Sequence, residues 1–194
     1  MKQVGNILYF VLGLVFYTAC SNDDDFAGDS LHAVARLNAD AVVQYEKEMA
    51  LFTLNDIKSF NTKTGEITFN HFILDTHLFW GGYRVYFYDG DILLFDAVPV
   101  SWFSSIGYFD QLTFQCDFYG PDDMWDASQS HFYLLYGYPG TIKGDPTIEK
   151  LKQKNAAGMD RFIQILRRAG KIVDAWPEDY INVHYGADRQ MQGW

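Results

Sequence analysis

The chain has 194 residues, of which 48% are hydrophobic and 18% are aromatic, and its formal net charge is −10. This apolar content predicts a folded chain rather than a disordered one, and the length suits one domain with its own core. The acidic balance argues against a nucleic-acid partner and against adhesion to an anionic lipid surface, because both need a basic footprint.

The first 19 residues have the organisation of an export signal. Lys2 provides a positive charge, and residues 7–16 (ILYFVLGLVF) form an apolar run. This run is too short to span a membrane, since a spanning helix needs about 20 residues. We therefore expect a signal peptide over residues 1–19. An ordinary secretory signal cleaved near Ala19 and an uncleaved cytosolic N-terminus are the alternatives.

Residues 17–20 (YTAC) resemble the lipobox of bacterial lipoproteins, although Tyr17 stands where an aliphatic residue is usual. Looser versions are typical of Bacteroidetes-type lipoproteins. The resemblance implies that the Cys20 thiol carries diacylglycerol, that the leader is removed, and that acyl chains tether the protein to a membrane. The following acidic run (SNDDD) resembles a signal that directs some of these lipoproteins to the outer face of the outer membrane. Residues 20–30 are expected to form a flexible acidic tether in either case.

Residues 31–194 are expected to form a single α+β domain, because no repeat or linker divides them. Residues 31–50 could hold a short helix, a strand or both, and a strand is expected near residues 48–52. Thr53 followed three residues later by Asp56 resembles a helix N-cap, so residues 53–60 predict a short helix. Residues 66–72 then alternate apolar and polar side chains, as a strand does.

The clearest strand signal is a hairpin around Asp89 and Gly90, which separate two runs of β-forming residues. A two-residue loop of this kind needs positive φ at both central positions. The predicted strands cover residues 83–88 and 91–98. Alternation places Val85 and Phe87 on one face of the first strand and Arg84, Tyr86 and Tyr88 on the other.

Two further strands, over residues 111–119 and 131–138, complete an expected antiparallel β-meander of about four to six strands. A long C-terminal amphipathic helix of about 24 residues follows, with Asp145 as its cap, Pro146 in its first turn and Gly170 after its end. We expect this helix to pack on one face of the meander. Its stripe, with one polar interruption, comprises Ile148, Leu151, Asn155, Met159, Phe162, Ile163 and Leu166.

Candidate metal ligands occur in two places, and neither has the spacing of a known metal motif. His71 and His77 flank Asp75 and could ligate zinc if a loop folded back, with polar surface or core positions as the alternative. The aspartates of residues 122–126 (Asp122, Asp123 and Asp126) could offer oxygens to calcium, but they lack the spacing and the distal glutamate of a calcium loop, and a solvated loop is the alternative. Cys116 is interpreted as a buried strand residue rather than a catalytic thiol. We therefore expect no catalytic site, no metal and no cofactor.

The aromatic residues provide the candidate binding surface. Core and cross-strand packing explains most of them. One helix covers one face of a sheet, however, and the uncovered face would form a flat amphipathic platform that suits a glycan or a protein partner. The candidate platform residues are Trp80, Arg84, Tyr86 and Tyr88.

From about residue 50 to 173, the order of elements resembles a group of Bacteroidetes lipoproteins known as hypothetical proteins. The resemblance rests on "FTLNDIKSFNTKTGEITF", the hairpin, "YLLYGYP" and the closing helix with "GKIV". It implies no activity and no catalytic residues. We therefore expect a non-enzymatic cell-envelope lipoprotein, anchored at the outer membrane through acyl chains and working as a binding or accessory subunit with an outer-membrane protein or a glycan. A small surface hydrolase acting on envelope or glycan polymers and a structural anchor are the alternatives.

Overall fold

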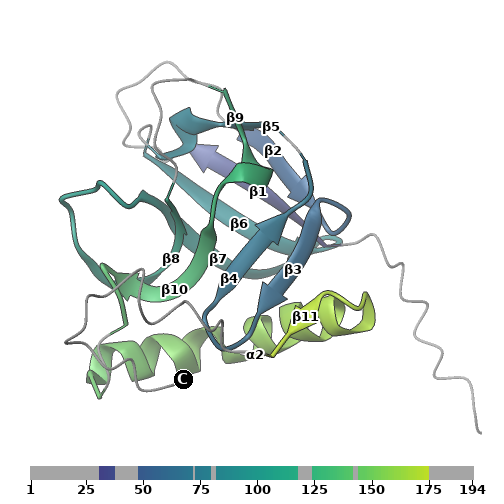
Figure 1. Cartoon of the computed structure of the whole chain (residues 1–194). Helices are drawn as coiled ribbons and strands as arrows, with labels where there is room; N and C mark the ends of the chain where they lie inside the picture. Colours follow the sequence, from purple (N-terminus) through teal and green to yellow (C-terminus); the bar gives the residue numbers. More distant parts are fainter. Residues whose placement is uncertain are drawn as a thin grey trace, which may run out of the picture.

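A computed structural model of the chain (Figure 1) describes residues 31–37, 48–71, 73–79, 82–117, 124–141 and 144–174. Within these residues, a mixed nine-stranded sheet packs against one long helix, so the predicted α+β class is confirmed. The expected signal peptide, Cys20 with its tether, and residues 175–194 lie outside the described residues.

The elements have the following bounds. In spatial order the sheet contains β11 (Ile172–Val173), β3 (Ile57–Asn61), β4 (Glu66–Phe69), β10 (Phe132–Tyr138), β8 (Tyr108–Cys116), β7 (Ile92–Ser101), β6 (Tyr83–Asp89), β1 (Leu31–Leu37) and β2 (Glu48–Thr53). A separate pair joins β5 (Ile73–Asp75) to β9 (Met124–Asp126). The helices are the 3₁₀ helices η1 (Thr76–Phe79) and η2 (Ala127–Gln129) and the α-helix α2 (Pro146–Arg168).

The prediction of an antiparallel meander is wrong, because β7 and β8 run parallel. Val98 pairs with Thr113, and β11 also pairs in parallel with β3. The chain returns from the end of β7 to the start of β8 through residues 102–107, which is far shorter than the usual crossover helix between parallel strands. Alternation along a strand identifies its faces but carries no information about the direction of its neighbour.

The short helix predicted over residues 53–60 is also wrong, since Thr53 ends β2, residues 54–56 form a turn and residues 57–60 belong to β3. The expected contact is nevertheless present: the Asp56 carboxylate accepts hydrogen bonds from the Thr53 backbone N–H (2.8 Å) and hydroxyl (2.9 Å). Here it closes the tight turn between β2 at one edge of the sheet and β3 near the other edge. The sheet therefore curls strongly, and the ring of Phe52 in β2 lies 4.9 Å from that of Phe69 in β4.

The predicted β6–β7 hairpin is confirmed, with its loop one position later than expected. Asp89 pairs with Ile92, so Gly90 and Asp91 form the loop. Among the described residues, every positive φ belongs to a glycine, and Gly90 has φ 56°. A loop with glycine at its first central position needs no positive φ at the second, which explains how Asp91 is accommodated.

The helix α2 closely matches its prediction, with 23 residues. The Asp145 side chain accepts from the Thr147 N–H, and Gly170 has φ 69° after the last turn. Figure 1 shows α2 lying along one side of the curved sheet. Its Phe162 ring lies 5.3 to 5.9 Å from three phenylalanine rings of the sheet's inner face. Its buried side chains are Ile148, Leu151, Asn155, Phe162, Ile165 and Leu166.

Candidate ligand-binding cleft

Three of the four predicted platform residues lie on the outer face of β6, opposite the aromatic core. Along this strand, half-buried Arg84, Tyr86 and Tyr88 alternate with buried Val85 and Phe87, which confirms the predicted division into faces. The fourth residue, Trp80, lies outside the described residues.

Side chains of β1 already cover the two tyrosine rings. The guanidinium carbon of Arg36 lies 5.2 Å from the ring centroid of Tyr86 and 5.5 Å from that of Tyr88, and Arg36 donates a hydrogen bond to the Tyr88 hydroxyl (2.7 Å). The His32 ring stacks on Tyr88 at 5.3 Å. A hydrogen bond to Glu48 raises the pKa of Arg36 above its ordinary value. Arg36 and His32 thus already contact the rings of Tyr86 and Tyr88, so these rings do not form the flat open platform that the sequence predicts.

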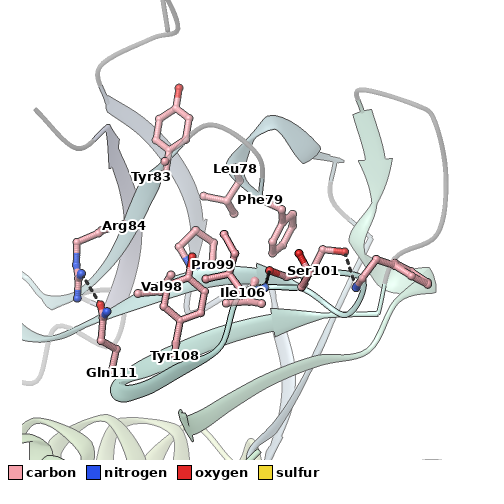
Figure 2. Close-up of a pocket in the computed structure, with 15 residues that line it drawn as sticks. Leu78, Phe79, Tyr83, Arg84, Val98, Pro99, Ser101, Ile106, Tyr108 and Gln111 are labelled. Carbon is pink, nitrogen blue, oxygen red and sulfur yellow. Dashed lines mark hydrogen bonds between the residues drawn. The ribbon is translucent and has the colours of Figure 1, made fainter. Parts of the chain in front are cut away.

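Arg84 points away from this row toward β7 and β8. Its Nε donates to the Asp96 carboxylate (2.7 Å), and its Nη1 donates to the side-chain oxygen of Gln111 (2.8 Å). Because two partners on different strands hold the guanidinium, its position is well defined. Figure 2 shows this Arg84–Gln111 hydrogen bond at one side of a cleft.

The cleft has a volume of about 560 Å³ and is lined by residues of η1, β6, β7, β8 and the loop of residues 102–107. Figure 2 shows Leu78 and Phe79 of η1 across from β7 and the loop of residues 102–107. Its apolar lining comprises Leu78, Phe79, Val98, Pro99, Val100, Phe103, Ile106 and Tyr108, and its polar lining includes Arg84, Gln111, Ser101, Ser104 and Ser105. The lining therefore mixes apolar and polar groups, and the volume lies within the range of small-ligand sites.

Tyr138 holds the loop wall of the cleft in place. Its hydroxyl lies 2.9 Å from the carbonyl oxygen of Trp102 and 3.1 Å from that of Ser104, so one β10 side chain fixes the start of the loop. Burial raises the pKa of Tyr138 above its ordinary value. On this supported loop, Phe103 and Ile106 remain largely exposed beside the cleft.

The residues considered as metal ligands form separate pairs. His77 Nδ1 lies 2.7 Å from Asp75 Oδ1, and His71 Nδ1 lies 2.9 Å from Asp126 Oδ2. Asp126 also caps η2, and its hydrogen bonds, above all from the Ser128 hydroxyl, lower its pKa to about 2. Across the described ranges, no three His, Cys, Asp or Glu side chains gather as a candidate metal site.

Of the remaining predicted residues, Cys116 is the one that lies within the described ranges. Cys116 is fully buried at the end of β8, in agreement with its interpretation as a strand residue. Cys20, Asp122 and Asp123 lie outside the described residues. In the part of the chain that the structure describes, no helix combines the length and apolar character needed to cross a membrane.

Sequence reasoning missed the cleft because its lining comes from segments that are distant in the chain. Arg84 was predicted as a binding residue, yet its partners Asp96 and Gln111 and the facing η1 were not. The one available signal is "SWFSSIGYF", in which three serines stand among large apolar residues where β7 passes into β8. Comparisons with protein-family models, with curated proteins and with solved structures found no match.

Proposed function

We propose that this chain is a non-enzymatic, lipid-anchored binding protein of the bacterial cell envelope, and that its cleft binds a short segment of a glycan. Two independent features support the proposal: the lipobox-like residues 17–20 support the anchor, and the cleft beside Arg84 supports binding. The protein would work as a binding or accessory subunit at the outer membrane. The observation that carries the binding function is the fixed Arg84–Asp96–Gln111 group at the edge of a cleft with a mixed apolar and polar lining.

A glycan fits the mixed chemistry of this cleft. One face of a sugar ring presents C–H groups, which pack against aromatic and aliphatic side chains such as Phe79, Phe103 and Tyr108. Its hydroxyls both donate and accept hydrogen bonds. Arg84 supplies donors, and Gln111 supplies a donor and an acceptor, so together they can satisfy a hydroxyl pair.

The anchor is tested by feeding cells an alkyne-labelled fatty acid. We expect label on the full-length protein, loss of label in Cys20→Ala, and retention of label in Cys116→Ala, which removes the internal cysteine. An unlabelled protein that washes from membranes without detergent would contradict the anchor.

Binding is tested with the detergent-solubilised lipoprotein on an array of envelope and dietary glycans. We expect retention of a subset of glycans and at least about tenfold weaker binding by Phe103→Ala, which corresponds to about 1.4 kcal/mol. Phe103 is exposed, so its truncation leaves the core intact. The matched control is Ile73→Ala, another exposed apolar residue, which does not line the cleft. Binding of no glycan, or equal loss in both variants, would contradict the cleft as the site.

A further inference from the structure

The β6–β7 hairpin has an exposed apolar tip beside the point where the described chain enters the sheet. Ile92 and Leu93, which follow the Gly90–Asp91 loop, expose 67% and 49% of their surface. In the β1–β6 pairing, Leu31 lies opposite Asp89. The first residue of β1 is therefore a neighbour of the hairpin turn.

The length of chain before β1 limits how far this tip can lie from the lipid anchor. The ten residues 21–30 separate Cys20 from Leu31. A chain spans at most about 3.6 Å per residue, so the eleven steps from Cys20 to Leu31 cannot span more than about 40 Å. With acyl chains on Cys20, the hairpin tip stays within a few tens of ångströms of the bilayer surface.

We infer that the tip formed by Ile92 and Leu93 is a membrane-contact site, which inserts into the interface of the same bilayer that holds Cys20. This inference rests on the proposed lipid anchor and extends it. Two apolar side chains are too few to bring a free protein to a bilayer. The lipid anchor already holds the protein at the bilayer, so insertion of the tip is an intramolecular step. The effective concentration of the tip at the membrane is then in the ~mM range, which is enough for a weak contact to form.

The charges near the tip indicate an apolar contact rather than an electrostatic one. Asp91 is exposed in the turn, while the carboxylate of Asp89 is mostly buried and accepts a hydrogen bond from Arg161 (2.7 Å). Because the turn and the protein as a whole are acidic, anionic lipids would not strengthen this contact. The contact should therefore form on zwitterionic bilayers and resist added salt.

Insertion of the tip would orient the cleft. β7 begins at Ile92 in the tip and ends at Ser101 in the cleft lining. With a rise of about 3.3 Å per residue, the cleft floor from Val98 onward lies about 20–30 Å along the strand from the tip. A hairpin held at the membrane would thus direct the cleft toward the extracellular or periplasmic solution, where a polymer can reach it.

The test uses the full lipoprotein, acylated at Cys20, in phosphatidylcholine vesicles. Ile92→Cys is labelled with an environment-sensitive nitrobenzoxadiazole dye, and Ile106→Cys is the matched control, because Ile106 is also an isoleucine, is 60% exposed and lies at the cleft. Cys116 is fully buried and stays unlabelled in the folded protein. We expect dye at position 92, but not at position 106, to shift its emission to the blue and to be quenched by lipids carrying a nitroxide near the headgroup.

The outcomes of this experiment distinguish a failure of the membrane-contact site from a failure of the lipid anchor. If the protein floats with the vesicles and dye at position 92 is quenched no more than dye at position 106, the membrane-contact site is wrong while the anchor stands. If the acylated protein fails to float with the vesicles in the absence of detergent, both the anchor and the membrane-contact site are wrong. Quenching at position 92 that disappears in high salt would overturn the apolar nature of the contact.

Discussion

Gly158 of α2 lies so close to Leu94 of β7 that a Cβ atom on Gly158 would stand 2.0 Å from the Leu94 carbonyl oxygen. Leu94 is the residue left over by a β-bulge, since Phe87 pairs with Phe95 and Tyr88 pairs with Leu93. A glycine in the middle of a helix thus faces an irregularity in a strand. This contact determines where α2 lies along β7.

The first prediction concerns Gly158→Ala. In an open helix this change stabilises by about 1 kcal/mol, because alanine has the higher helix propensity. Here the added methyl group meets backbone, so we expect the free energy of unfolding to fall by about 1–3 kcal/mol. Urea denaturation measures the change. The control is Ala157→Gly at a neighbouring exposed position, with an expected cost of about 0.5–1 kcal/mol. A more stable Gly158→Ala variant would show that the helix does not approach the bulge.

The second prediction concerns the ion pair between Arg161 Nε and Asp89 Oδ2, at 2.7 Å. The Asp89 side chain is 8% exposed and the Arg161 side chain is 40% exposed, so solvent partly screens the pair. Arg161→Met removes a charged donor from a mostly buried carboxylate, and we expect a loss of about 1–3 kcal/mol in unfolding free energy. Arg167→Met, on the exposed side of α2, should change stability by less than about 0.5 kcal/mol. A double-mutant cycle with Asp89→Asn that gives no coupling energy would count against the pair.

The third prediction concerns Phe162, which is fully buried and contacts the rings of Phe60, Phe87 and Phe95. Phe162→Ala leaves a cavity between α2 and the sheet, so we expect a loss of about 3–5 kcal/mol. Gln164→Ala, on the exposed side of the same helix, should stay within about 0.5 kcal/mol of the parent. Circular dichroism melting curves measure both. An unchanged curve for Phe162→Ala would remove α2 from the core.

The fourth prediction concerns Asp126, whose pKa in the folded protein is lowered from 3.8 to about 2. The unfolded chain takes up a proton at a higher pH than the folded chain does. The charge of Asp126 therefore contributes its full stability above about pH 4, and this contribution is lost as the pH falls toward 2. Asp126→Asn preserves the cap of η2 but removes the charge. We expect the stability difference between parent and variant to be largest near neutral pH and to close between pH 3.8 and about 2. A difference that does not change over this range would argue against the lowered pKa.

Local patterns predicted several elements well. The cap at Asp145, the glycine at position 170 and the apolar repeat between them predicted α2 almost to the residue. Alternation predicted the two faces of β6 correctly. The failure at Thr53 and Asp56 is instructive, because the same side-chain contact that caps a helix also closes a turn. In the turn, the Leu54 backbone N–H donates to the carbonyl oxygen of Leu31 in β1 (2.8 Å), a partner that local sequence does not reveal.

The sequence by itself determined where the long helix begins and ends, which side chains of β6 face the core, and that Cys116 is buried. These properties follow from neighbouring residues, because helix caps and strand alternation act over a few positions. Only the tertiary structure decided that β7 and β8 run parallel, that the sheet curls through the turn after Thr53, and that Arg84 meets Gln111 beside a cleft. Those features depend on contacts between segments far apart in the chain. Many pairings of the same strands satisfy the same local pattern, and the packing of the whole molecule selects one of these pairings.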